Sequence, residues 1–209
     1  MKTIHFLLLF FLLFTTSVLG TDTDSTTIKV HFLYGSKPAK GYKDVEYKWF
    51  GGILGGHVGI EFDSNRVSNF LPYRGFHIFG RRKKKNRRSA YTTQTVKGFW
   101  EIFGSPEDSV KKLTVEIPVS VHQQILLDSV MTQYTRDTPY DYAFIGMRCA
   151  SSTYDLLAQI GIFKPLPIWR MTFKVFYPRP LRKRILHMAK KNNWYYTTQE
   201  GTKRRKWER

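Results

Sequence analysis

Short segments in which apolar and polar residues alternate recur along much of the chain, a pattern typical of half-buried strands. Two of them, 57–62 and 67–71, are separated only by the polar turn 63–66, so they predict an antiparallel hairpin. The other segments predicted as strands are 28–34, 90–96, 98–103, 112–119 and 193–198. Strands joined by connections this short favour an antiparallel sheet.

Apolar residues at helical spacing predict three helices. The segment 120–133 opens with Ser-Val-His-Gln, which resembles a capping box. A second helix is expected over 149–160, where Gly161 provides a C-terminal stop. A short basic helix over 181–190 follows a proline-rich stretch at 165–180 that we expect to be a loop. The pattern therefore predicts an α+β fold in which an antiparallel sheet packs against the second helix.

The first twenty residues have the pattern of a secretory signal peptide. A lysine near the start precedes an apolar run at 4–14, and small residues then precede the expected cleavage site. The run is too short to span a bilayer comfortably. We therefore expect an exported protein, periplasmic or secreted, whose mature chain 21–209 is a monomeric single domain. Residues from about 163 to 209 would form a basic C-terminal extension of that domain.

Cys149 is the only cysteine in the chain, so no intramolecular disulfide can form. It lies at the first turn of the second predicted helix, where free amide groups and the positive end of the helix dipole favour a thiolate. A single cysteine in an exported protein indicates a reactive thiol or an intermolecular bridge. The alternative is a buried structural cysteine, since free cysteine is among the most buried residue types.

His57 and Asn69 are expected to meet across the predicted hairpin. Side chains alternate along a strand, and the short turn brings Asn69 near the level of His57, where it could fix the tautomer of the imidazole. A thiolate at a helix start, an imidazole on a strand and a group that orients it are the parts of a cysteine hydrolase. Backbone amides at the helix start could hold the oxyanion.

Two motifs resemble those of the NlpC-type papain-like cysteine hydrolases. Gly56-His57-Val58-Gly59-Ile60 is similar to the histidine motif of that family, and Asn69 stands twelve residues after His57 at the position of the orienting residue. The segment 139–144, Pro-Tyr-Asp-Tyr-Ala-Phe, followed by Cys-Ala-Ser at 149–151, is similar to the nucleophile motif. Here the histidine precedes the cysteine, which is the order of the circularly permuted branch of the family.

The resemblance covers about residues 28 to 162 and implies a permuted papain-like fold. It implies that Cys149, His57 and Asn69 are catalytic. It also implies an exported hydrolase that cleaves an amide, in a cell-wall peptide or a related substrate, through an acyl-thioester. The residues expected to bind substrate are Tyr140, Tyr142, Gly56 and Ala150. Ala and Ser at 150–151 stand where many permuted members have Ser and Glu, so the surroundings of the thiol differ.

Two other functions remain open at this stage. The permuted branch includes enzymes similar to lecithin:retinol acyltransferase, so a lipid ester hydrolase or an acyltransferase would fit the same scaffold. A non-catalytic module that binds an anionic glycan or lipid would fit the basic segments at 81–88 and 203–206 with aromatic residues near the second. The chain has no His-Glu-x-x-His or Cys-x-x-Cys spacing, so we expect no metal and no cofactor.

The formal net charge of the chain is +18 at pH 7. Such a charge favours anionic partners, and export makes nucleic acid an unsuitable one in vivo. Seven of the eight residues at 81–88 are basic, and we expect this segment to be an exposed loop that binds an anionic cell-envelope polymer or lipid surface. The residues concerned are Arg81, Arg82, Lys83, Lys84, Lys85, Arg87 and Arg88.

Overall fold

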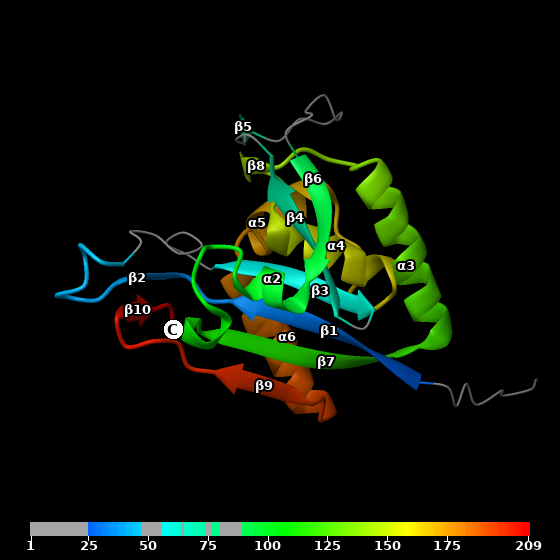
Figure 1. Ribbon diagram of the computed structural model, residues 1–209. Helices are drawn as coiled ribbons and strands as arrows, with labels where there is room; N and C mark the ends of the chain where they lie inside the picture. Colours follow the sequence, from blue (N-terminus) through cyan, green and yellow to red (C-terminus); the bar gives the residue numbers. More distant parts are fainter. Residues whose placement is uncertain (1–24, 47–55, 64, 74–76, 80–88) are drawn as a thin grey trace, which may run out of the picture.

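A computed structural model describes residues 25–46, 56–63, 65–73, 77–79 and 89–209 of the chain. Its centre is a six-stranded, fully antiparallel sheet with the strand order β6-β4-β3-β1-β7-β9 (Figure 1). The strands are β1 (Ser25–Leu33), β3 (His57–Asp63), β4 (Arg66–Pro72), β6 (Ser89–Thr95), β7 (Lys112–Ser120) and β9 (Tyr196–Gln199). The predicted α+β class and antiparallel sheet are therefore confirmed.

One face of the sheet carries the main hydrophobic core. Alternation along β1, β3 and β7 sends every second side chain to this face, where α3 (Val121–Arg136), α4 (Cys149–Gln159) and α6 (Pro178–Asn192) cover it (Figure 1). The fully buried sheet residues of this core are Ile28, Val30, Phe32, Val58, Ile60, Phe70, Leu113, Val115 and Ile117. The predicted helices at 120–133 and 149–160 are confirmed, and Ser120 and Gln123 form the expected capping box.

The opposite face of the sheet is covered by the short helix α2 (Val96–Trp100), drawn in front of the sheet in Figure 1. The strand predicted over 98–103 was wrong. Thr95 ends β6 and caps the helix, because its side chain accepts a hydrogen bond of 3.0 Å from the Gly98 amide. Phe99 and Trp100 then pack in a second small core on the sheet. The apolar pattern of 98–103 fits a strand as well as a helix, so it could not predict this packing.

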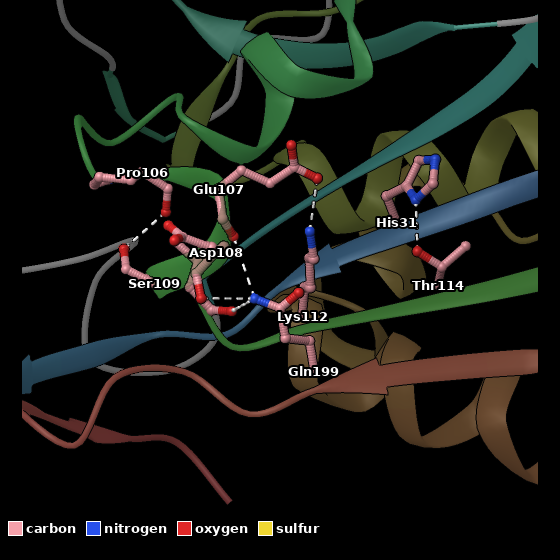
Figure 2. A network of polar contacts seen from close by, with 9 residues as sticks. His31, Pro106, Glu107, Asp108, Ser109, Lys112, Thr114 and Gln199 are labelled. Atoms are coloured by element: carbon pink, nitrogen blue, oxygen red, sulfur yellow. Dashed lines mark hydrogen bonds and ion pairs between the residues drawn. The ribbon is translucent and has the colours of Figure 1, made fainter.

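A polar network on this side holds β9 to the rest of the sheet (Figure 2). The Gln199 side-chain amide donates to the carbonyl oxygens of Glu107 and Asp108 at 3.3 and 2.9 Å. Lys112 of β7 forms an ion pair of 2.8 Å with the Glu107 carboxylate. Both contacts involve the 3-10 turn η1 (Glu107–Ser109), so this turn links β7 and β9. Further along the same face, His31 of β1 bonds Thr114 of β7 at 2.8 Å.

The C-terminal part of the chain packs into the domain. The proline-rich segment expected to be a loop contains the helix α5 (Ile168–Lys174), and the basic C-terminus contains the strand β10 (Arg205–Trp207), which pairs with β2 (Ser36–Pro38). Arg205 is buried, and its guanidinium bonds Ser36 Oγ at 2.7 Å and the Glu46 carboxylate at 3.0 Å. The segment expected as an extension thus completes the fold with α6, β9 and β10.

A third, two-stranded sheet lies at the end of the molecule away from β9 and β10 (Figure 1). It pairs β5 (His77–Phe79) in parallel with β8 (Ala143–Ile145). Of the helices in the described part of the chain, none is both long and apolar enough to cross a membrane. The predicted signal peptide at 1–20 and the basic run at 81–88 lie outside the described residues.

Candidate active site

His57 and Asn69 form the hydrogen bond that the hairpin predicted. The register pairs Ile60 with Ser68, which puts His57 and Asn69 on one face of the sheet. The imidazole Nε2 lies 2.9 Å from Asn69 Oδ1. The Asn69 amide nitrogen in turn donates to the Thr92 carbonyl at 3.4 Å. This second bond orients the amide so that its oxygen faces the ring. Because that oxygen can only accept, Nε2 carries the proton and the lone pair of the neutral ring is at Nδ1.

The His57 ring is buried, and its burial controls its charge. Phe99 and Phe103 lie beside the ring, with centroid distances of 5.6 and 6.0 Å. Loss of hydration lowers the pKa of His57 to about 4, against a smaller opposing effect of the bond to Asn69. The imidazole is therefore neutral at physiological pH. A neutral ring with a free lone pair at Nδ1 can accept a proton.

Two glycines of the histidine motif are required by close packing. Gly56 has φ of 63°, and a Cβ there would lie 1.7 Å from the Leu33 carbonyl oxygen. A Cβ at Gly59 would lie 2.7 Å from a methyl carbon of Val67 and 2.9 Å from the Phe99 ring. These glycines let β1 and α2 approach the strand on either side of His57. Gly56 thus has a structural role in addition to the expected approach of substrate.

Cys149 is the first residue of α4, as predicted, and its thiol is buried. The sulfur interacts with the backbone amides of Val58 and Ala150 and with the Tyr142 hydroxyl. Burial nevertheless raises the pKa of the Cys149 thiol above its ordinary value, although the Arg148 charge and these hydrogen bonds oppose the increase. The resting group is therefore a neutral thiol. The expectation of a thiolate was wrong, because removal from water outweighs the helix start.

The thiol and the imidazole approach the same stretch of β3 from different faces. Alternation directs His57 toward the side of α2 and Val58 into the core beneath, where Cys149 also lies. The sulfur contacts the backbone of Val58, one residue after His57. Both groups lie in the described part of the chain, and no hydrogen bond joins them there. Proton transfer between the two groups would therefore require a bridging water molecule.

Arg148 is a neighbour of the thiol that the sequence motifs did not indicate. Its guanidinium lies 4.9 Å from the ring centroids of both Phe176 and Tyr177 and 5.5 Å from that of Phe144. Its buried Nη1 has no hydrogen-bond partner among the described residues. Aromatic rings hold the cation by cation–π attraction and keep water away. The only available signal was its position next to Cys149.

Replacing Arg148 with glutamine is expected to slow alkylation of Cys149 by iodoacetamide severalfold at a fixed mildly alkaline pH. The Arg148 charge lowers the pKa of the thiol, so its removal leaves less thiolate. Arg148→Lys, which keeps the charge, should retain much of the rate. Arg136→Gln removes an exposed cation at the end of α3 and should leave it unchanged. Equal rates in wild type and Arg148→Gln would show that the guanidinium does not act on the sulfur.

The residues expected to bind substrate fall into two groups. Tyr142 and Ala150 lie at the thiol, through the hydroxyl and the backbone amide respectively. Tyr140 is buried in the core, where its hydroxyl bonds the Tyr91 hydroxyl and, at 3.4 Å, the Asp155 carboxylate. The Tyr140 hydroxyl is therefore hydrogen-bonded to other side chains within the core. The structure assembles Tyr142 and Ala150 with Cys149 and separates Tyr140 from them.

The α2 face carries a second buried histidine. His31 Nε2 lies 2.7 Å from a Glu61 carboxylate oxygen, and its ring and that of His57 both contact Phe99. Burial lowers the pKa of His31, and the bond from His31 lowers the pKa of Glu61, so a neutral imidazole donates to a carboxylate. A cavity of about 860 Å³ is lined by the loop 102–106, which includes Phe103, and by Thr202, Arg204 and Arg205. It does not adjoin Cys149.

Within the described residues, no three His, Cys, Asp or Glu side chains are grouped so that they could hold a metal ion. Comparison with known proteins found no matching family model, no matching curated protein and no matching solved structure. The function is therefore inferred from the geometry of this chain and from the motifs of its sequence.

Proposed function

We propose that this protein is an exported cysteine hydrolase with Cys149 as nucleophile, His57 as general base and Asn69 as the residue that orients His57. The observation that carries the proposal is the 2.9 Å bond between His57 Nε2 and Asn69 Oδ1. It leaves Nδ1 as the basic nitrogen of a ring that is neutral at pH 7. Nδ1 is bonded to Cγ and is thus the ring nitrogen nearer the backbone of β3, which the thiol contacts at Val58.

The proposed reaction starts from a neutral thiol and a neutral imidazole. As Cys149 Sγ attacks the carbonyl carbon of an amide, its proton passes to Nδ1 of His57 through one bridging water molecule. The oxyanion is held by backbone amides at the start of α4. The tetrahedral intermediate then collapses, the C–N bond breaks, and the amine leaves with the proton from His57. Water, deprotonated by the same imidazole, hydrolyses the thioester and restores the thiol.

The substrate is proposed to be an amide in a cell-wall peptide or a related molecule. The motifs around His57 and Cys149 support this choice, because they resemble those of NlpC-type hydrolases. An antiparallel sheet with a helix that begins at the cysteine is compatible with a permuted papain-like fold. The basic run at 81–88 is proposed to attach the enzyme to an anionic polymer or lipid surface of the envelope.

One observation favours a second candidate, a non-catalytic module that binds an anionic glycan or lipid. The thiol has a raised pKa and does not bond the imidazole among the described contacts. A protein that had lost catalysis would keep the fold and the basic surface and would tolerate such a geometry. The two candidates differ in one measurable property, which is acylation of Cys149.

The pH dependence of acylation tests the hydrolase proposal. With p-nitrophenyl acetate as the acyl donor, kcat/KM should fall as the pH falls through about 4, because His57 becomes protonated there and cannot accept the thiol proton. Asn69→Asp, which places a carboxylate against Nε2, should move this acid limb to higher pH, because a neighbouring negative charge favours the imidazolium. Release of p-nitrophenol measures both profiles.

Asn69→Ala is the matched control for this experiment. It removes the orienting bond without adding charge, so it should lower kcat/KM by about tenfold to a hundredfold and should not raise the acid limb. An acid limb that stays in place in Asn69→Asp would exclude His57 as the base. A wild-type protein that releases no p-nitrophenol above the spontaneous rate would favour the binding module.

A further inference from the structure

The small sheet of β5 and β8 exposes large apolar side chains to solvent. β5 pairs in parallel with β8, which brings Phe79 opposite Ile145. Phe79 is 67% exposed, and Ile78, Phe144 and Ile145 are exposed as well. Single exposed apolar residues are common on soluble proteins, but a contiguous group marks a site of interaction. Ile145 is four residues before Cys149, so this group adjoins the proposed active site.

The helix α5 continues the exposed apolar surface. Trp169 and Phe173 stand four residues apart, on one face of the helix, and are 61% and 77% exposed. Phe176, which follows α5, contacts the Phe144 ring of β8 at a centroid distance of 6.0 Å. The two strips are therefore connected. We call them together the apolar platform, which consists of Ile78, Phe79, Phe144, Ile145, Ile168, Trp169 and Phe173.

Both charged residues of α5, the helix that carries Trp169 and Phe173, are basic. Arg170 and Lys174 are exposed on α5 itself, and the Arg170 guanidinium lies 5.0 Å from the centroid of the Trp169 ring. Aromatic and aliphatic side chains mixed with cations are the composition of surfaces that insert shallowly into bilayers that contain anionic lipid.

We propose that the apolar platform docks the protein on the surface of an anionic lipid bilayer. The platform's side chains enter the boundary of the acyl region while Arg170 and Lys174 contact the headgroups. An anionic polysaccharide would satisfy the cations but offers no apolar phase for Trp169 and Phe173. This docking does not depend on the proposed hydrolase activity, and it would place the start of α4 close to the membrane.

Sedimentation with vesicles tests the proposal on the mature chain. Vesicles of phosphatidylcholine with phosphatidylglycerol should bind the protein at least about tenfold more tightly than vesicles of phosphatidylcholine alone, and high salt should reduce the difference. Trp169→Ser combined with Phe173→Ser should weaken binding to the anionic vesicles about tenfold. This double variant retains every cation, including those at 81–88, so its effect reports the apolar contacts alone.

Val121→Ser combined with Ile125→Ser is the matched control. These residues are exposed at the start of α3, which lies away from β5 and β8 in Figure 1. Their replacement should therefore leave vesicle binding unchanged. Thermal melts of both double variants check that the fold is intact. Cys149→Ala should bind vesicles like wild type, which separates docking from catalysis.

Two results would overturn the proposal. The first is equal vesicle binding by wild type and the Trp169→Ser, Phe173→Ser variant. The second is a wild-type protein that ignores vesicles but self-associates in size-exclusion chromatography, with the association lost in that variant. The platform would then be an interface between two copies of the chain.

Discussion

Cys149→Ala is expected to reduce p-nitrophenyl acetate hydrolysis to the spontaneous rate, a loss on the order of 10,000-fold. The chain has no second cysteine that could replace the nucleophile. Cys149 is also the residue on which the Val58 and Ala150 amides and the Tyr142 hydroxyl converge. Without the sulfur, no acyl-thioester can form. The rate of p-nitrophenol release at saturating and limiting substrate measures the loss.

His57→Ala provides the second arm of this experiment. Residues that act as one catalytic unit are strongly non-additive, so Cys149→Ala with His57→Ala should be no slower than Cys149→Ala alone. Ser152→Ala, which removes a hydroxyl that bonds the Cys149 carbonyl at 2.9 Å, is the control for a disturbed helix start and should stay within a few fold of wild type. Activity in Cys149→Ala equal to that of wild type would rule out the hydrolase proposal.

Gly56→Ala is expected to destabilise the protein by more than about 3 kcal/mol, because backbone strain and a steric clash act together. Its φ of 63° is unfavourable for alanine, and the new Cβ would lie 1.7 Å from the Leu33 carbonyl oxygen. That oxygen belongs to β1, which pairs with β3 at Leu33 and His57. The clash must therefore separate the two central strands or move the start of β3. Urea unfolding measures the cost.

Gly104→Ala is the matched control for Gly56→Ala. Its φ of 78° is also positive, but nothing lies within 4 Å of the added Cβ. It should cost about 1 kcal/mol, the amount expected from backbone conformation alone. The difference between the two variants then measures the packing of β1 against the histidine motif. Equal costs would contradict the close approach of Leu33 to Gly56.

Features set by residues close together in the chain could be predicted from sequence. The hairpin brings His57 to Asn69 because only a short turn separates two strands whose side chains alternate, and the hydrogen bond follows from these two facts. The capping box at Ser120 and the helix start at Cys149 depend on neighbouring residues in the same way. In 98–103, by contrast, alternation alone suggested a strand. The cap at Thr95 and the packing of Phe99 on the sheet instead stabilise a helix there.

The tertiary structure alone decided the chemistry of the thiol. A helix start favours a thiolate, but the core around Cys149 excludes water from its sulfur. This burial raises the pKa of the thiol. The rings that hold Arg148 come from segments far apart in the chain, with Phe144 just before it and Phe176 and Tyr177 almost thirty residues after it. Burial and charge depend on which distant segments meet. Local spacing carries no record of that, although it was sufficient to predict the hairpin of β3 and β4 and the helices α3 and α4.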